Sequence, residues 1–234
     1  KYVELLMEKG ATTRHKMIEA IIQPDSIFLS EGQNLLIEEF GKDYGIYFSI
    51  LSAIATGHCQ RSQIEDLVNR EIGGYLSMLE DTYGIIRKHK PMFSKTNSNV
   101  RYRLDDNFLS FWFRFIFKYN YMMEIDAFDA LREIVERDYE TFSGKMLERY
   151  FKDKLIEEKQ FTQIDNWWSR NGEDEIDLIA INELTKKAVF YEIKRNEKEL
   201  DLPLLEQRTN TFLVSTRELK KYTISSTGLS LIDM

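Results

Sequence analysis

The 234-residue sequence has one cysteine, three prolines and three histidines. Because Cys59 is alone, the chain cannot form an internal disulfide, and nothing in it indicates an oxidising compartment. His15, His58 and His89 lie far apart, and none stands at helical spacing from another histidine or from Cys59. The sequence therefore gives no support to a zinc site, and the histidines are interpreted as isolated surface or core residues.

Long apolar runs are missing as well. The most apolar stretch, Phe108–Phe117, is about half as long as a membrane-spanning helix must be, and it contains Arg114. No secretory signal pattern is visible. We therefore expect a cytoplasmic protein without a membrane partner.

The charge balance is typical of a soluble globular protein, with a net charge of −7 and 30% charged residues. A negative total argues against a protein that coats DNA over its whole surface. The distribution is uneven, because every charged residue between Gly84 and Leu104 is basic. This basic flap contains Arg87, Lys88, Lys90, Lys95, Arg101 and Arg103, which are candidate contacts to nucleic-acid phosphates.

The amino-terminal half predicts a helical segment followed by a winged helix-turn-helix. Residues 1–40 have helical patterns with a break at Gln23–Ser26. In residues 41–122 three short helices are followed by two strands around a polar loop: helices near 46–54, 61–69 and 75–79, strands at 85–86 and 100–104, and the loop at 91–99. Aromatic residues then recur at helical spacing over 108–121, which favours a deeply buried helix over a base-stacking platform.

Residues 123–234 predict a third domain with a mixed α/β or α+β core. Its expected helices cover 126–139, 143–159 and 202–211, and its expected strands cover 161–168, 175–181, 188–194 and 222–225. The fold class is therefore α+β, with three domains at 1–40, 41–122 and 123–234.

A pair of acidic strands in this third domain predicts a functional site. If the hairpin is symmetric about the Leu184–Thr185 bond, the numbers of facing residues sum to 369, and Asp177 faces Glu192. Strict alternation places Asp177 on the same face as Ile179 and Ile181, where a surface aspartate is not expected. Lys194 follows two residues after Glu192 and points to the same side.

Two carboxylates placed this way repel each other unless a cation lies between them. Mg²⁺ suits the position, because it takes one or two carboxylates together with waters and a phosphate oxygen. Asp177 and Glu192 are then the metal ligands, and Lys194 orients water or stabilises a phosphate in the transition state. Glu148, on a preceding helix, is a candidate third acid. The alternatives are an ordinary amphipathic hairpin with solvated charges and an exposed helical glutamate at 148.

With these residues in view, the chain resembles the carboxyl-terminal part of the archaeal-type (DEXX-box) AAA+ ATPase family. The resemblance rests on Lys1-Tyr-Val-Glu-Leu-Leu, on residues 47–57, on the segment 102–115 with its Phe-Trp-Phe-Arg-Phe run, and on Trp168–Ala180 with Glu192-Ile-Lys194. It implies a winged helix and a restriction-endonuclease-like domain of the PD-(D/E)xK group, in which Asp177, Glu192 and Lys194 match the catalytic pattern and Glu148 the helical acid that some members use.

The family also carries nucleotide-binding motifs, and here the chain departs from it. No G-x-x-x-x-G-K-[ST] loop is present. The resemblance therefore implies that ATP binds only to a preceding amino-terminal ATPase domain, which would also be a partner of this region. It leaves the oligomeric state and the biological process open.

Two functions follow. In the first, the winged helix binds duplex DNA and the third domain hydrolyses phosphodiesters with Mg²⁺. In the second, the chain is a non-catalytic binding or regulatory module with a degenerate nuclease fold. The expected recognition helix, Gly73–Tyr83, supports the second, because it contains Glu80 and Asp81 but no arginine or lysine.

Overall fold

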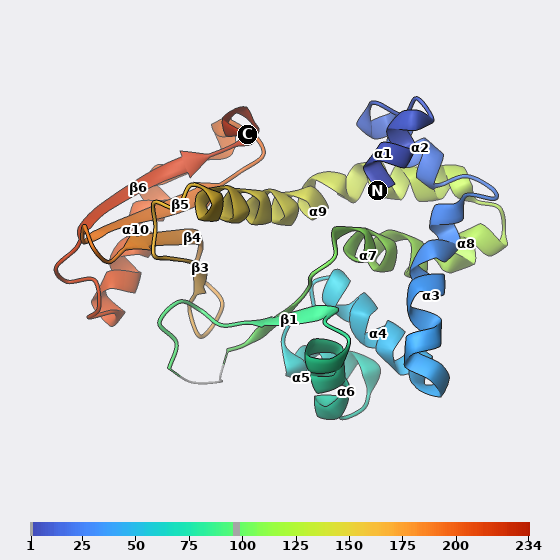
Figure 1. The fold of residues 1–234 in the computed structure, drawn as a ribbon, viewed down its shortest axis with the longest axis horizontal. Helices are drawn as coiled ribbons and strands as arrows, with labels where there is room; N and C mark the ends of the chain where they lie inside the picture. Colours follow the sequence, from blue (N-terminus) through green and yellow to red (C-terminus); the bar gives the residue numbers. More distant parts are fainter. Residues whose placement is uncertain (1, 96–98) are drawn as a thin grey trace. The chain divides into compact units, whose positions relative to one another are not determined.

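The computed structural model describes residues 2–95 and 99–234, and its chain divides into two compact units. Unit 1 contains residues 1–89 and 101–139, and unit 2 contains residues 90–100 and 140–234. The predicted α+β class is confirmed, since helices and a mixed sheet are both present (Figure 1). Over the described ranges, no helix combines the length and apolar character needed to cross a membrane. The predicted three-domain division stays a prediction.

Unit 1 is mainly helical. Its elements are α1 (Tyr2–Glu8), α2 (Arg14–Ile21), α3 (Ile27–Phe40), η1 (Gly41–Asp43), α4 (Tyr44–Ala55), α5 (Arg61–Val68), α6 (Gly73–Ser77), η2 (Met78–Thr82), α7 (Asn107–Phe111), η3 (Trp112–Phe117), α8 (Asn120–Glu124) and the first part of α9 (Phe128–Glu157). An antiparallel hairpin of β1 (Ile86–His89) and β2 (Arg101–Leu104) follows η2 in the chain. The three helices and the hairpin expected over 46–104 are therefore all present.

The aromatic segment forms the core of unit 1, as predicted, although its backbone differs from a single α-helix. The chain changes from α7 to the π-helical turns of η3, and α8 begins only at Asn120. Trp112, Phe113 and Phe115 are at most 3% exposed. Trp112 also donates its indole N–H to the carbonyl of Leu29 at 3.0 Å. These three rings are thus part of the core and are not available to stack on bases.

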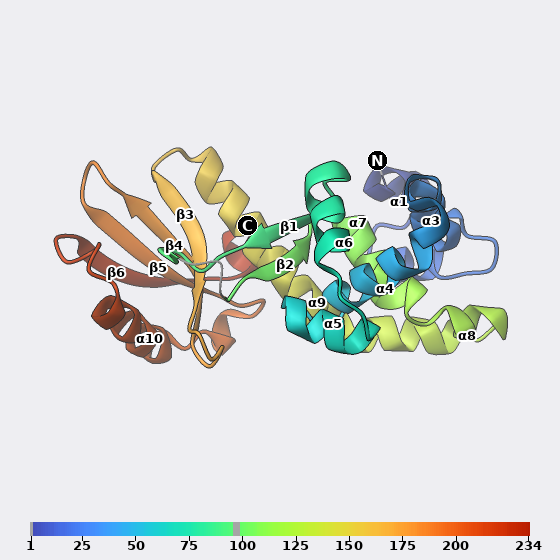
Figure 2. The ribbon, with the colours of Figure 1, turned by 90° about the horizontal axis from the view of Figure 1, so that it is seen from below.

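Unit 2 is a four-stranded sheet between two helices. Its strands β3 (Gln163–Trp168), β4 (Glu175–Asn182) and β5 (Lys187–Ile193) are antiparallel neighbours, and β6 (Thr223–Leu229) pairs with β5 in parallel. The helix α10 (Leu202–Ser215) connects β5 to β6 and lies along one face of the sheet (Figure 2). Short turns η4 (Glu197–Glu199) and η5 (Leu231–Asp233) complete the unit.

The two faces of the sheet pack against different helices. On one face, side chains that include Ile179, Ile181 and Phe190 contact Leu205 and Phe212 of α10. On the other face, Leu178, Ala180, Tyr191 and Ile193 contact the α9 residues Leu147, Phe151 and Leu155. Alternation along β4 and β5 therefore fixes which residues face which helix.

The helix α9 (Phe128–Glu157) corrects a prediction, because it replaces the two helices expected at 126–139 and 143–159. The break was expected at 140–142, directly before Ser143 and Gly144, which are weak helix formers. Ser143 is nevertheless accommodated: it is 8% exposed, its hydroxyl donates to the carbonyl of Glu140, and it accepts a bond from Arg195. Tertiary packing therefore overrides the local preference, and the boundary between the units falls inside the helix.

The segment 91–99 is predicted as a polar loop between the two strands, and its described residues form neither a helix nor a strand. Its burial was not predicted, because Pro91 and Met92 are buried in unit 2. The Met92 N–H donates to the carbonyl of Asn166 at 2.9 Å, and the Trp168 indole donates to the carbonyl of Asn99 at 3.1 Å. Residues 96–98 of the predicted loop lie outside the described residues, as does Lys1.

Candidate active site in unit 2

The register of the acidic hairpin is confirmed over its regular part. Ile181 pairs with Ala188 and Ile179 with Phe190, as the sum of 369 requires. The pairing ends at Leu178 and Tyr191, however, so the direct backbone pair of Asp177 with Glu192 is not formed. The reason is a local irregularity in β4.

A β-bulge in β4 surrounds Asp177. Asp165 of β3 pairs with Ile179, whereas Trp167 pairs with Ile176, so β4 contains one residue more than β3 over this interval. Ile176 consequently packs in the same cluster as Ile179 on the α10 face. The strict alternation predicted for β4 is therefore wrong between Ile176 and Ile179, and the bulge re-aims Asp177.

The carboxylate of Asp177 takes the place of a backbone acceptor at the end of the ladder. Its Oδ2 accepts the N–H of Ile193 at 2.7 Å. Its own carbonyl accepts the side-chain amide of Asn166, a residue of β3 that is 3% exposed. The bulge is thus fixed from both neighbouring strands, and Asp177 is tied to the end of β5.

Glu192 is the most buried acid of the site, at 3% exposure. Its Oε2 accepts the N–H of Asp201 at 2.6 Å, and its Oε1 lies 3.5 Å from Nζ of Lys194. Asp201 is the N-cap of α10, and its carboxylate accepts the N–H of Leu204 at 2.9 Å. One end of α10 therefore determines the position of Glu192.

The segment between β5 and α10 packs closely on β6 beside Glu192. Glu192 pairs with Gly228 of β6. A Cβ atom on Gly228 would lie 2.5 Å from Cδ1 of Leu200, a distance that real Cβ contacts essentially never show. The glycine therefore allows Leu200 to lie against the sheet and brings Asp201 to Glu192.

The charges of the site act on one another. Burial raises the pKa of the Asp177 carboxyl above its ordinary value, and the charges of Glu175 and Glu192 raise it further. The N–H of Ile193 and the charge of Lys194 act in the opposite direction. Asp177, Glu192 and Lys194 are thus brought into one electrostatic cluster, which Glu175 also joins.

This cluster offers a metal ion two carboxylates rather than a complete cage. Within residues 2–95 and 99–234, no three side chains of the His, Cys, Asp or Glu type are placed to share a metal ion. Oxygen donors are the ligands that Mg²⁺ prefers, and it commonly retains several waters. Asp177 and Glu192 fit that chemistry. Glu148 is half-buried on α9, one residue after Leu147, which packs against the sheet.

The basic flap is divided between the units, and several of its charges are neutralised locally. In unit 1, Arg87 pairs with Asp105 and Lys88 pairs with Glu80 at 3.4 Å. In unit 2, Lys95 lies 3.6 Å from Glu218. Of the other predicted contacts, Arg101 and Arg103 lie on β2, and Lys90 lies in the segment that joins unit 2. The six cations are therefore distributed over both units.

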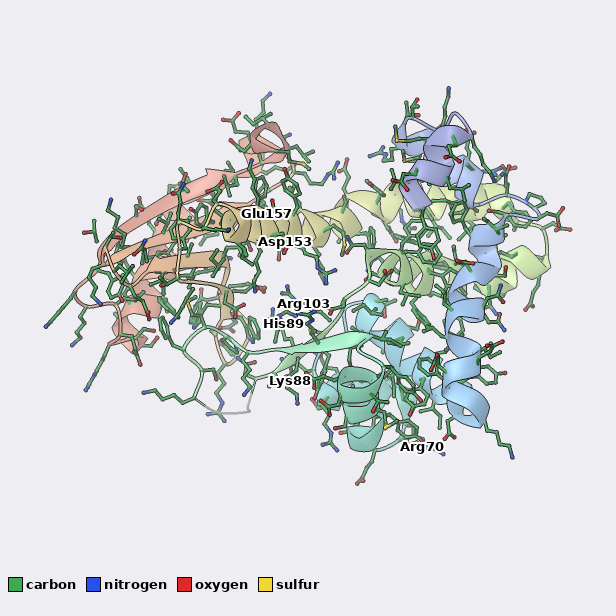
Figure 3. The ribbon with its side chains drawn as sticks, in the orientation of Figure 1. Arg70, Lys88, His89, Arg103, Asp153 and Glu157 are labelled. Atoms are coloured by element: carbon green, nitrogen blue, oxygen red, sulfur yellow. The ribbon has the colours of Figure 1, made fainter. Side chains whose placement is uncertain are left out.

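The expected recognition helix, α6 with η2, uses its acids for internal contacts. Glu80 accepts the backbone N–H of Lys88 at 3.0 Å, and Asp81 accepts the hydroxyl of Ser77 at 2.9 Å. Lys88 is labelled on β1 in Figure 3, where Arg103 is also shown. Over residues 73–82 the exposed residues are Gly74, Ser77, Met78, Asp81 and Thr82, so this surface lacks the amides and cations that usually contact base edges.

The sequence did not identify three residues that position the site: Asn166, Asp201 and Gly228. For Asp201 a signal existed, because an aspartate directly before Leu202 and Pro203 is typical of a helix N-cap. Asn166 and Gly228 act through β3 and β6, whose pairing with the hairpin depends on long-range register. No local pattern in the sequence gives that register.

Comparisons with known proteins find similarity over part of the chain. The chain is 33% identical over 180 residues to the uncharacterized protein MJECL04 of Methanocaldococcus jannaschii, an alignment that covers 73% of this chain and 40% of that protein. The chain thus spans well under half the length of that relative. No solved structure matches. Residues 112–214, from η3 through nearly all of α10, match the DUF234 family model, whose description is archaea bacterial proteins of unknown function.

Proposed function

We propose that unit 2 is a metal-dependent nuclease-like domain that hydrolyses phosphodiester bonds in DNA. The observation that carries the proposal is that Asp177 of β4 accepts the N–H of Ile193, the residue between Glu192 and Lys194 on β5, while Lys194 lies 3.5 Å from Glu192. The three residues follow the order Asp, spacer, Glu-x-Lys that the PD-(D/E)xK resemblance implies. Chance alternation of charges on an exposed hairpin would leave them solvated, whereas Glu192 is 3% exposed.

Each side chain has a distinct role in this proposal. Asp177 and Glu192 would hold a divalent cation, which would supply positive charge at the scissile phosphate and lower the pKa of a bound water. Lys194 keeps its ammonium group 3.5 Å from Glu192, where its charge would stabilise the reacting phosphate. Asp201 and Ile193 hold the two carboxylates through their backbone N–H groups, so the ligands are positioned before substrate binds.

We further propose that the chain is the carboxyl-terminal region of a AAA+ ATPase. The resemblance of residues 47–57 and 102–115 to that family supports this context, and so does the length of MJECL04, which leaves room in that protein for other domains. ATP binding would belong to the ATPase domain. Unit 1 would then connect that domain with the nuclease-like unit.

A non-catalytic regulatory module is the second candidate, and one observation favours it. The α6–η2 surface has no exposed cation, and the cations Arg87 and Lys88 of the hairpin are paired with acids. These features favour a protein partner over DNA for the winged-helix region. DNA contact by the flap is therefore not part of the first proposal.

Cleavage assays with matched variants separate the two candidates. Supercoiled plasmid and short labelled oligonucleotides are incubated with Mg²⁺ or Mn²⁺ and, in parallel, with EDTA. We expect metal-dependent cleavage that falls about 100-fold or more in Lys194→Ala and Asp177→Asn. The first substitution removes a positive charge that stabilises the transition state, and the second removes a charged metal ligand. Lys187→Ala, an exposed lysine at the other end of β5, is the control and should cleave normally. Equal cleavage by all variants would refute the assignment.

Duplex binding tests the role of the flap independently. Titrating a labelled duplex at two salt concentrations measures the phosphate contribution, since electrostatic binding weakens as salt rises. We expect Lys90→Ala and Arg103→Ala to leave duplex affinity within about twofold of the wild type. A large loss in either variant would restore the flap as a DNA contact.

A further inference from the structure

A pocket of about 470 Å³ lies in unit 2, beside the β3 end of the sheet. One wall is the segment from Pro91 to Lys95, the second is the end of β3 with the turn after it, and the third is the chain that follows α10. The backbone bond from Met92 to Asn166 and the indole bond from Trp168 to Asn99 fix the first wall to the second. The pocket is therefore built from structured chain.

The walls present aromatic rings that are only partly covered. Phe93 and Trp167 are half-buried, and both rest on the buried ring of Phe212, with ring centroids 6.3 Å and 5.3 Å away. Trp168 differs, since it is 1% exposed and belongs to the core. Phe93 and Trp167 thus offer rigid apolar surface to a ligand while Phe212 supports them from behind.

The rim is positively charged. Arg170 and Arg217 are exposed, and neither guanidinium has a hydrogen bond or ion pair with another residue in the part of the chain that is described. Lys95, whose side chain is 86% exposed, lies 3.6 Å from Glu218, the acid of the rim. Two cations therefore remain uncompensated at the mouth of an aromatic pocket.

The pocket also lies close to the candidate active site along the sheet. Trp168 pairs with Glu175 and Trp167 pairs with Ile176, and Asp177 is the next residue of β4. Paired residues in neighbouring strands are about 4.5–5.5 Å apart. A polymer bound in the pocket therefore needs to extend only a short way to reach Asp177.

We infer that this pocket binds a single-stranded nucleic-acid segment, with a base against Trp167 and Phe93 and phosphates at Arg170 and Arg217. Aromatic stacking combined with cations along the backbone is how proteins bind unpaired strands without sequence preference. A duplex hides the faces of its bases, so only an unpaired strand can use the aromatic wall. The inference rests on the proposed function, because it names the form of the substrate that approaches Asp177.

Binding is measured in EDTA, so that cleavage does not interfere, by fluorescence anisotropy with a fluorescein-labelled (dT)₁₂ oligonucleotide. We expect the double variant Arg170→Glu/Arg217→Glu to bind at least about 10-fold more weakly, because each reversal places a negative charge beside a phosphate. The control is Lys220→Glu/Lys221→Glu, which changes charge equally on exposed residues of the same unit outside the pocket lining. It should bind within about threefold of the wild type.

Three results would overturn the inference. Equal weakening by the two double variants would show that general charge, not the pocket, binds the oligonucleotide. Competition by tripolyphosphate as strong as by unlabelled (dT)₁₂ would show an anion site that ignores bases. Equal competition by a duplex would remove the single-strand preference.

The Lys194→Ala variant separates the inference from the proposed nuclease activity. Lys194 is not part of the pocket lining, so this variant should bind (dT)₁₂ normally whether or not the wild type cleaves. If the wild type fails to cleave but binding still depends on Arg170 and Arg217, the nuclease proposal fails and the pocket stands. Cleavage that persists with unchanged kinetics in the arginine variant, together with unchanged binding, refutes the pocket alone.

Discussion

Replacing Asn166 with alanine tests whether the β4 bulge positions the candidate site. The side-chain amide of Asn166 donates to the carbonyl of Asp177, and the residue is 3% exposed. The carbonyl of Asn166, by contrast, accepts the N–H of Met92 through the backbone, a bond that the substitution keeps. The change therefore removes one side-chain contact without releasing the segment 90–95.

The expected cost follows from the burial of this contact. Removing one partner of a buried hydrogen bond and leaving the other unsatisfied costs about 1–3 kcal/mol. Domains are typically stable by about 5–15 kcal/mol, so a loss of 2 kcal/mol lowers the folding equilibrium constant about 30-fold while unit 2 stays folded. We expect a second effect at the site itself, because a relaxed bulge no longer holds the Asp177 carboxylate beside Glu192.

Guanidinium unfolding and Mg²⁺ titration by calorimetry measure the two effects. Trp167 and Trp168 report the unfolding of unit 2, and Trp112 reports that of unit 1. Gln163→Ala is the matched control, because Gln163 also lies on β3 and its exposed amide donates to Glu183 at 2.9 Å. We expect this control to cost less than about 0.5 kcal/mol. If Asn166→Ala matches this control in both stability and Mg²⁺ affinity, the bulge does not position Asp177.

Three further predictions test the charges and close contacts. Without metal, Asp177→Asn should stabilise unit 2 at neutral pH. The pKa of Asp177 is raised in the folded state, so the wild type loses stability as the pH rises above the pKa of the unfolded state. Chemical unfolding at pH 4 and pH 7 should therefore show the gain in stability only at pH 7. Gly228→Ala should cost about 1–3 kcal/mol in unfolding assays and weaken Mg²⁺ binding, because its Cβ displaces Leu200. Gly32→Ala should destabilise unit 1 at least as much, because its Cβ would overlap the ring of Trp112. Mg²⁺ binding should stay unchanged, since Gly32 lies in the other unit. A melting temperature equal to that of the wild type would contradict this prediction.

Local patterns were sufficient to predict most of the elements. Period-two alternation located β4 and β5, and the polar turn between them gave the register of Ile179 with Phe190. Helical spacing of apolar residues located α4 and α5. These features depend on residues that are close in sequence, and the hydrophobic period alone determines them.

The failures arose where distant contacts decide the structure. A break is predicted at 140–142, before the weak helix formers Ser143 and Gly144, but the bond from Arg195 and the packing of Leu147 keep α9 continuous. Met92 follows a proline in a polar stretch, yet its side chain is buried in the core cluster with Ile179 and Phe212. The carbonyl of Asn166 accepts its N–H there. In both cases the partner lies more than 50 residues away, beyond the reach of a periodicity argument.

The site itself shows the same division between local and distant determinants. Choosing Asp177, Glu192 and Lys194 required only the hairpin, but their arrangement depends on the bulge opposite Asn166 and on Asp201 at the start of α10. A register sum assumes one residue opposite one residue, and a bulge violates that assumption by definition. The predicted facing pair was therefore wrong in detail, although the same residues are brought together.

The arrangement of Asp177 and Glu192 lowers the stability of the folded state, and this cost is itself an argument for a metal-binding site. Burial disfavours the ionised form of Asp177, and a buried glutamate such as Glu192 needs partners for its charge. Asparagine at position 177 would relieve the first cost and still offer an oxygen to the N–H of Ile193. Strain of this kind is expected where carboxylates must remain ionised and close together to bind a cation. Lys194 supplies only one compensating charge, so the two acids keep the net negative charge that a divalent ion would neutralise.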